Sequence, residues 1–431
     1  MMDNTFSEAI QLDVNDSFKP LTDFFDLPLD KHGQPAIYLN GNSLGPKPKN
    51  IDQALIKECK TWGLHGVRGH FDQEYPWIFY NKLVTHSLAR LVGAKSEEVS
   101  AMGTLTANLH ALFVSFYRPT RTRFKIIRLA GFSSDTYAIE SQVKQRLDTI
   151  HEFCQIEPFK LDDVIIVIKP NRQGYIDHNT FKIIIEEHGD QTAVIWIEAV
   201  HYLTGQYFNI PEITRLAHDK GCKIGLDLAH AIGNVPLKLH QWDVDFAVWC
   251  SYKYLSAGPG AIAGLYINEK YLSDPNLIRF SGWWGHNPLT RFKMPSTFDP
   301  IPTSEGWQVS NPAIFLLSAL RQALTIFDQI DFDALINKNK RLVSYLENLI
   351  HSSLSTKVQI ITPNNPDERG CQLSLRIKGA SAESEMEKIF LNHGVICDAR
   401  KDLIRVAPMG LYTTFSDVFN FVEKLKLICL N

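Results

Sequence analysis

The sequence predicts an α/β fold in which helices cover both faces of a mainly parallel sheet, followed by a smaller α+β domain. Two observations support this prediction: short apolar runs fill the middle of the chain, and the pattern changes after about residue 330. The runs lack polar alternation, which is typical of strands buried on both faces of a parallel sheet. They are VIIVI (164–168), AVIWI (193–197), KIGLDL (223–228), DFAVWC (245–250) and AIAGLYI (261–267).

Helix signals lie between and after these runs. IPEITRLAHDKGC places Pro211 at an expected first helical position and Gly221 just past the helix end, where these residues favour helix boundaries. With its two neighbouring runs, this segment predicts one βαβ unit. Later, an amphipathic helix at about 332–351 precedes alternating runs at 371–377 and 403–407, which indicates an α+β arrangement.

The chain length of 431 residues leaves room for two or three domains. Residues 1–60 are rich in Pro, Gly and Asn, and we predict that they pack with the small domain instead of folding alone. Residues 61–330 form the predicted large domain, which would contain the functional site. Residues 331–431 form the predicted small C-terminal domain.

The composition is that of a globular enzyme, with 45% hydrophobic and 21% charged residues. The net charge of -3 supplies no basic field for nucleic acid or an anionic membrane. Seven dispersed cysteines without a CxxC pair argue against a disulfide framework and a structural zinc site, and favour a reducing compartment. We see no signal pattern and no apolar run of roughly 18 residues. We therefore expect a cytoplasmic protein without metal, nucleic acid or membrane partners.

An acid and a lysine follow two of the predicted strands. Asp227 and His230 come at the end of KIGLDL, and Lys253 comes just after DFAVWC. Ligands of open α/β sheets bind beyond the carboxyl ends of the strands, so these side chains should reach one site. Singly, Asp227 is more often a turn former and Lys253 a surface residue. Together they suit pyridoxal 5'-phosphate (PLP), whose aldehyde binds a lysine while a carboxylate keeps its ring nitrogen protonated.

Two loop-to-helix junctions offer donors for the phosphate of this cofactor. MGTLTANLHALF places Gly103, Thr104 and Thr106 before an apolar-periodic helix, and helix N-termini with hydroxyl groups bind anions. The ordinary alternative is a plain threonine N-cap. Tyr252, next to the lysine, places a phenol within reach of the same phosphate.

The second junction is GFSSDTYAIES. Here Phe132 can stack on a ring, and Ser133, Ser134 and Asp135 can cap the helix or bind the cofactor. The ordinary alternative is an Asp or Ser cap with Phe132 in the core.

From about residue 38 to its end, the chain resembles the kynureninase family, PLP-dependent hydrolases of aminotransferase fold type I. The resemblance rests on an ordered series of blocks: YLNGNSLGPKPK (38–49), LTANLH (105–110), FSSDTYAIES (132–141), DLAHAIGNVPLKLHQWDVDFAVWCSYKYL (227–255), GWWGH (282–286), TRFKM (290–294), SNP (310–312), ERGCQLS (368–374) and IRVAP (404–408). It implies a PLP-dependent transferase-like large domain with a mixed, mainly parallel seven-stranded sheet. It also implies a homodimer that hydrolyses L-kynurenine or 3-hydroxy-L-kynurenine to anthranilate or 3-hydroxyanthranilate and L-alanine, in tryptophan degradation or NAD biosynthesis.

The resemblance also implies residue roles. Lys253 would bind PLP and later move the Cα proton, while Asp227 would pair with the ring nitrogen beside His230. Phe132 would stack on the ring. The other cofactor residues, mostly at the phosphate, would be Leu105, Thr106, Ser133, Ser134, Asp135, Tyr252, Trp283 and Asn311.

The substrate site is implied in the same way. Arg405 would clamp the α-carboxylate through its planar guanidinium, in preference to a strand-edge ion pair. His70, Ser310 and Asn311 fall where the family contacts the aromatic part of kynurenine, although His70 is equally consistent with a loop histidine. Trp283 and Asn311 would reach across from a second subunit.

Three positions depart from the family pattern. Glu198, in WIEAVHYLTG, stands where relatives often carry a small or hydroxyl residue, so its carboxylate would repel the phosphate or point elsewhere. Gln308 stands where an arginine is expected, and Ser133 where a proline is expected. These departures concern the substrate more than the cofactor.

Three other classes of protein are alternatives to this family. A cysteine desulfurase could use Cys371 as nucleophile, but such chains carry His and Gln where this one has Tyr252 and His230. A catalytically silent PLP-binding relative is disfavoured by the joint presence of Lys253, Asp227 and Arg405. A nicotinamide-dependent dehydrogenase is disfavoured because no GxGxxG follows an early strand.

For the hydrolysis that the resemblance implies, Tyr252 is the candidate base for the addition of water.

Overall fold

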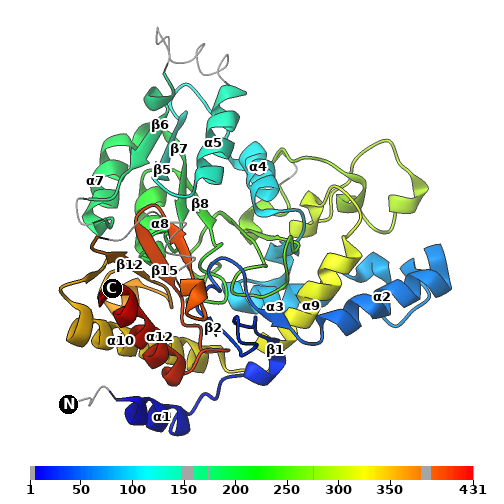
Figure 1. The fold of residues 1–431 in the computed structure, drawn as a ribbon. Coiled ribbons are helices and arrows are strands. Elements are labelled where there is room, and N and C mark those ends of the chain that lie inside the picture. Colours follow the sequence, from blue (N-terminus) through cyan, green and yellow to red (C-terminus); the bar gives the residue numbers. More distant parts are fainter. Residues whose placement is uncertain (1–4, 147–159, 172–173, 275, 380–389, 431) are drawn as a thin grey trace.

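A seven-stranded sheet lies at the centre of the larger part of the molecule (Figure 1). The strand order is β4-β10-β9-β8-β7-β5-β6. Only β10 runs antiparallel to its neighbours β4 and β9, so the predicted mixed, mainly parallel sheet is confirmed. The strands are β4 (Val99–Ala101), β5 (Lys125–Leu129), β6 (Ile165–Ile168), β7 (Thr192–Glu198), β8 (Lys223–Asp227), β9 (Phe246–Trp249) and β10 (Gly264–Ile267).

The computed structural model describes residues 5–146, 160–171, 174–274, 276–379 and 390–430. Cys154, one of the seven cysteines, lies outside these ranges. Within them, none of the helices combines the length and the apolar composition that crossing a bilayer requires.

Both faces of the sheet are covered, which explains why the strands are continuously apolar. Adjacent residues of a strand point to opposite faces: Ile126 packs in one hydrophobic cluster and Ile127 in the other. The first cluster includes helices α4 (Leu105–Phe116) and α5 (Ser133–Lys144). The second includes α3 (Lys82–Val92), α7 (His178–His188) and α8 (Ile210–Asp219).

The predicted βαβ unit is confirmed as β7–α8–β8, because β7 and β8 pair in parallel. The side chain of Asn209 caps α8 by accepting the N–H of Glu212, and Pro211 lies in the first turn. Gly221 follows the helix with a φ of +71°, a left-handed conformation that glycine adopts without strain. The chain therefore turns sharply into β8.

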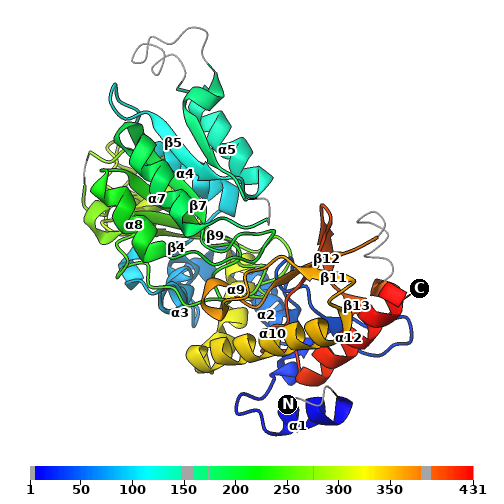
Figure 2. The ribbon, with the colours of Figure 1, turned by 90° about the vertical axis from the view of Figure 1, so that its left-hand side faces the viewer.

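A second, four-stranded antiparallel sheet is formed late in the chain, in the order β11-β12-β15-β14. Its strands are β11 (Val358–Ile360), β12 (Leu373–Ile377), β14 (Asp398–Arg400) and β15 (Leu403–Val406). Helices α10 (Phe332–Leu354) and α12 (Phe415–Leu430) lie side by side below this sheet (Figures 1 and 2). Helix α9 (Ile314–Asp328) leads into this region.

The N-terminal segment packs against the late part of the chain. Helix α1 (Phe6–Val14) lies against α12 (Figure 2), and the Asp13 carboxylate accepts the backbone N–H groups of Phe415 and Ser416 at 2.7 and 3.0 Å. Strand β2 (Ile37–Tyr38) pairs in parallel with β13 (Val395–Ile396). Strands β1 (Phe25–Asp26) and β3 (Lys47–Pro48) pair with each other, ahead of α2 (Ile51–His65). The domain boundaries near residues 60 and 330 stay a prediction.

A buried ion pair joins this segment to α10. Asp16 Oδ2 lies 2.8 Å from Lys338 Nζ, and the two side chains are 0% and 1% exposed. Arg341 Nη1 lies 2.8 Å from the other oxygen of Asp16. Because both basic groups face one carboxylate, its removal would leave a buried ammonium without its counter-charge.

We therefore expect Asp16→Ala to lower the free energy of unfolding by about 3 kcal/mol, measured by urea denaturation of the apo protein. Lys47→Ala is the control, since it breaks exposed pairs with Asp26 and Asp52 and should cost about 1 kcal/mol or less. Equal losses in the two variants would contradict the account.

Candidate active site

The structure brings Lys253, His230 and Asp227 together at the carboxyl edge of the large sheet. β8 ends at Asp227, and Lys253 follows the end of the neighbouring strand β9. Lys253 Nζ lies 2.9 Å from His230 Nε2. Burial raises the pKa of Asp227, while the charge of Lys253 acts in the opposite direction. The amine and the carboxyl group are therefore close enough to interact.

His230 is a neutral acceptor for the lysine. Burial, with the nearby charge of Lys253, lowers the pKa of His230 well below its usual range. Since an amine N–H donates to Nε2, the ring hydrogen lies on Nδ1. In the part of the chain that the structure describes, this buried Nδ1 has no hydrogen-bond partner. A buried N–H without a partner is unusual in proteins and is available to a bound group.

Asp135 lies beside Asp227. Burial, together with the charges of Asp227 and Glu198, raises the pKa of Asp135 well above its usual range, so it is protonated and can donate to Asp227. It also accepts the indole N–H of Trp196 at 2.8 Å. The ordinary alternative for this junction, an Asp135 cap, is absent, because the N-cap is Phe132 and the carboxyl group of Asp135 is buried. The assignment of Asp135 to the cofactor site stays a prediction.

Glu198 ends β7 and is paired in register with Asp227 on β8. One carboxyl oxygen accepts the backbone N–H of Phe132 at 2.5 Å, and the other accepts that of Tyr202 at 2.6 Å. Burial, with the charge of Asp227, raises the pKa of Glu198 to about 8. Of the two expectations for this carboxyl group, the structure supports the second: it points to backbone N–H groups.

The N-termini of α4 and α5 meet near this edge, because the two helices pack against each other. Thr106 Oγ1 lies 2.8 Å from Ser134 Oγ, and Thr104 caps α4 by accepting the N–H of Ala107. The plain threonine cap is therefore present, and one turn of each helix still offers N–H groups and a hydroxyl. Such a pair of N-termini suits a phosphate.

Phe132 is not a core residue. Its ring is 44% exposed and makes an edge contact with Tyr202, with centroids 5.4 Å apart. The neighbouring Ser133 is exposed as well. An aromatic face that the core leaves open is available to stack on a planar ligand.

Arg405 differs from its expected state. It forms an ion pair with Asp398, its partner across β14 and β15, so the strand-edge pair that we had set aside is present. Arg405 Nε donates to Asp398 at 2.7 Å, Nη2 donates to the other oxygen, and Nη1 donates to the Tyr202 carbonyl at 2.8 Å. These bonds use three of five N–H groups. One N–H on each terminal nitrogen remains for a carboxylate.

Four of the predicted residues, His70, Trp283, Ser310 and Asn311, are at the surface of the protein. His70 and Trp283 belong to an exposed aromatic cluster with Phe71 and Phe292, in which consecutive ring centroids lie 5.5–6.2 Å apart. Ser310 and Asn311 are exposed. His70 bonds the Val67 carbonyl and packs edge-on against Trp77, while Trp283 donates to the Arg291 carbonyl and packs against Trp284. The residues predicted for the aromatic part of the substrate and for the second subunit are therefore at the surface.

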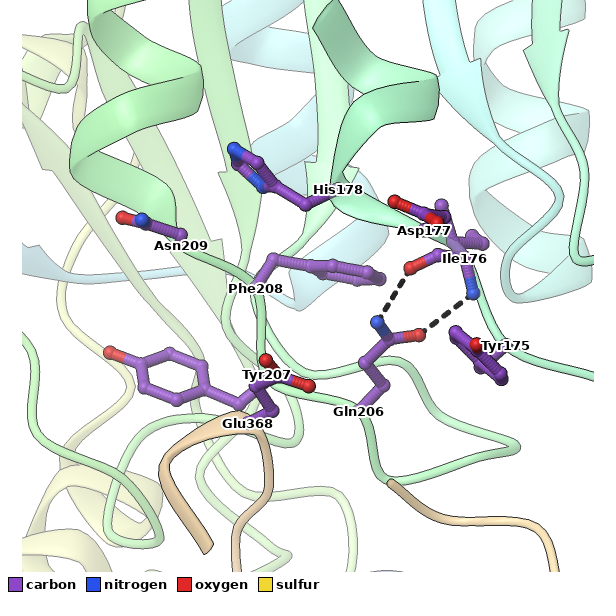
Figure 3. A pocket seen from close by; sticks show the side chains of 9 residues that line it. All are labelled: Tyr175, Ile176, Asp177, His178, Gln206, Tyr207, Phe208, Asn209 and Glu368. Carbon is purple, nitrogen blue, oxygen red and sulfur yellow. Dashed lines mark hydrogen bonds between the residues drawn. The ribbon is translucent and has the colours of Figure 1, made fainter. Parts of the chain in front are cut away.

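A cavity of about 420 Å³ lies elsewhere, at the N-termini of α7 and α8 (Figure 3). Gln206 borders it and bonds both the N–H and the carbonyl of Ile176, at 2.9 and 2.7 Å. The cavity contains none of the predicted site residues. Its lining is Tyr175, Ile176, Asp177, His178, Gln206, Tyr207, Phe208, Asn209 and Glu368.

Three residues of the site were not predicted from the sequence: Trp196, Tyr202 and Asp398. Trp196 and Tyr202 flank Glu198 in WIEAVHYLTG, and alternation along β7 would have placed Trp196 and Glu198 on one face. The position of Asp398 depends on the pairing of β14 with β15, for which the sequence carries no local signal.

The group suits PLP by its own chemistry. Lys253 supplies the amine, and Asp227 supplies a buried carboxyl group for the ring nitrogen. The unpartnered N–H of His230 lies beside them. The paired helix N-termini supply phosphate donors, and Phe132 supplies an open ring.

Comparisons with known proteins agree with this arrangement. The profile of the kynureninase C-terminal domain matches residues 335–425. Kynureninase of Myxococcus xanthus is 45% identical over 99% of this chain and 98% of its own length. Kynureninase of Koribacter versatilis is 41% identical over 98% of this chain and 97% of its own length.

Solved structures show the same fold at low identity. The cysteine desulfurase of Thermococcus onnurineus superposes with a TM-score of 0.73 at 15% identity, over 92% of this chain and 95% of that one. A C-DES mutant with glycine covalently linked to its PLP cofactor gives a TM-score of 0.72 at 13% identity, over 90% of this chain and 96% of that one. Because near-full-length identity above 40% is shared with the curated relatives and not with these structures, the chain belongs to the kynureninase family.

Proposed function

We propose that the chain uses PLP to hydrolyse the Cβ–Cγ bond of L-kynurenine or 3-hydroxy-L-kynurenine, releasing anthranilate or 3-hydroxyanthranilate and L-alanine. The observation that carries the proposal is the contact of Lys253 with neutral His230 beside the buried Asp227. Near-full-length similarity to kynureninases supports the choice of substrate. We place this reaction in the cytoplasm, in tryptophan degradation or NAD biosynthesis.

When bound, PLP supplies an electron-accepting ring conjugated with the substrate nitrogen, which stabilises negative charge on the adjacent carbons. Lys253 would hold the cofactor and, once released, move the Cα proton. Neutral His230 keeps the amine oriented without competing for positive charge. Asp227, which can receive a hydrogen bond from Asp135, would pair with the ring nitrogen.

Arg405 would bind the substrate α-carboxylate with its two remaining N–H groups. Asp398 and the Tyr202 carbonyl fix the plane of the guanidinium, so the arginine is already oriented before the substrate arrives. Preorganisation of this kind lowers the entropic cost of binding.

The phenol of Tyr252 is better suited to donate a proton or a hydrogen bond than to act as a general base. Burial, with the nearby Cys250, raises the pKa of its phenol, so the phenol is protonated at neutral pH. Its assignment as the base for water addition stays a prediction, and a hydrogen bond to the phosphate is the role that its state favours.

The desulfurase alternative is disfavoured by the state of Cys371. The thiol is 0% exposed, and burial raises its pKa to about 12. A buried, protonated thiol is a poor nucleophile, so Cys371 does not suit attack on a substrate sulfur.

A homodimer with shared active sites is the assembly we propose. Exposed apolar residues occur on α2, in the segment after it and between residues 289 and 315: Trp62, Leu64, Val67, Phe71, Leu289, Phe292, Met294 and Phe315. The rings of Trp62 and Phe315 are in contact, and those of Phe71 and Phe292 belong to the aromatic cluster described above. Leu64 is 81% exposed, and exposed clusters of this kind mark interfaces. His70 and Trp283 lie in the same cluster, so a partner seated there would meet both.

Lys253→Ala removes the amine that would bind the cofactor aldehyde. Reconstituted with PLP, this variant should lose the visible absorbance of lysine-bound cofactor. Anthranilate release from L-kynurenine, followed by fluorescence, should fall about a thousandfold or more. Lys182→Ala, on the exposed face of α7, is the control and should match the parent. A Lys253→Ala protein with the visible spectrum of the parent would refute the proposal. A parent protein that binds PLP but cleaves neither kynurenine would be a catalytically silent relative.

Leu64→Glu places a charge in the proposed interface. We expect it to shift the protein from dimer to monomer in light scattering, with turnover falling about tenfold or more because the sites are shared. Ile183→Glu changes a residue of α7 that is 62% exposed and should leave both properties unchanged. A Leu64→Glu protein that stays dimeric would place the interface elsewhere.

A further inference from the structure

Glu198 joins two separate segments of the chain. Its side chain is buried, with 3% of the residue exposed. Each oxygen of the carboxyl group accepts one backbone N–H, from Phe132 at 2.5 Å and from Tyr202 at 2.6 Å. Because each bond uses a different oxygen, only a carboxyl group can accept both at once from this position.

Gly131 makes room for this carboxyl group. A Cβ at residue 131 would lie 2.2 Å from Oε1 and 3.0 Å from Cδ of Glu198, and the three nearest atoms all belong to Glu198. The obstacle to a larger residue is therefore Glu198 itself, and not the surrounding backbone. Glycine at 131 and glutamate at 198 form a complementary pair.

The two joined segments serve different halves of the site. Phe132 is the N-cap of α5, which carries Ser134 and Asp135. Tyr202 uses its carbonyl to accept Arg405 Nη1 at 2.8 Å. The rings of Phe132 and Tyr202 are also in contact. Glu198 therefore lies between the loop proposed for the cofactor and the arginine proposed for the substrate.

A second, weaker link crosses the same gap. The backbone N–H of Thr204 donates to His201 Nδ1 at 3.3 Å, which leaves the ring hydrogen on Nε2, 3.4 Å from the Ala130 carbonyl. Burial lowers the pKa of His201 to about 4, so this link is neutral. It should hold the segments near each other when Glu198 is shortened.

We propose that Glu198 is a positioning residue. It holds the backbone at Phe132 and at Tyr202, whose carbonyl accepts Arg405, in fixed relative positions. Cofactor binding and recognition of the substrate carboxylate are therefore coupled. Both oxygens of Glu198 accept backbone N–H groups, so Glu198 acts through these two segments. The inference rests on the proposed function, which gives Phe132 to the cofactor and Arg405 to the substrate. Coupling of this kind acts in both directions, on the affinity for PLP and on that for the substrate.

Glu198→Ala removes both bonds. Titration of the apo protein with PLP, followed by absorbance and without turnover, should show a Kd about tenfold higher. KM for L-kynurenine should also rise about tenfold, while kcat changes less. Glu198→Gln keeps one acceptor oxygen and should give smaller increases in both.

Gly131→Ala supplies the sharper test. In the parent it should displace the carboxyl group and raise Kd and KM as Glu198→Ala does. Added to Glu198→Ala it should change little, because the Cβ then meets no side-chain oxygen. This non-additivity is the signature of a direct contact.

Glu98→Ala is the matched control. Glu98 is also buried and accepts two backbone N–H groups, from Lys95 at 2.8 Å and Glu269 at 2.9 Å, but it lies just before β4, at the opposite edge of the sheet. It should lower the melting temperature and leave Kd for PLP unchanged.

If Glu198→Ala kept the parent Kd for PLP and KM for L-kynurenine, the proposal would be overturned, whether or not stability falls. It would also be overturned if the increases in Kd and KM caused by Gly131→Ala and Glu198→Ala were additive in the double variant. If Glu198→Ala fails to fold, Glu198→Gln and Gly131→Ala decide by the same two measurements. Failure of the proposed function is distinct, because the parent itself would then bind no PLP or cleave neither kynurenine.

Discussion

The contact between Lys253 and His230, 2.9 Å apart beside a buried Asp227, is the interaction on which the rest of the site depends. It requires β8 and β9 to end at the same edge of the sheet, which their parallel pairing provides. It also requires an uncharged histidine, which burial provides. The covered sheet therefore sets both the position of these groups and their protonation.

The same edge gathers three carboxyl groups, on Asp135, Asp227 and Glu198. Burial and mutual repulsion raise the pKa of Asp135 and of Glu198, so protons reduce the negative charge near the lysine. The backbone N–H groups of Phe132 and Tyr202 bond the two oxygens of Glu198. The Trp196 indole bonds one oxygen of Asp135, and the Ala229 N–H bonds one oxygen of Asp227. A buried cluster of acids is tolerable under these conditions because few of its members carry charge.

Much of the fold could be predicted from the sequence, because buried parallel strands have continuous apolar sequences and because Pro211 and Gly221 mark the two ends of α8. Asp227, His230 and Lys253 could be located because each lies at or just past a strand end. The Arg405–Asp398 pair and the bonds of Glu198 could not, since they depend on register and on contacts between segments far apart in sequence. The choice between a cap and a buried acid at Asp135 could not be made from the sequence either, because it depends on the contacts of Asp135 with Trp196 and Asp227.

The Asp13 carboxylate caps α12 across 402 positions of the chain. Helix α1 thus has its native partner in a helix that is synthesised 402 positions later, and until then its apolar face stays uncovered. Long-range closure of this kind makes folding slow and exposes the nascent chain to aggregation. The large sheet, whose strands lie between, can form before the two ends meet.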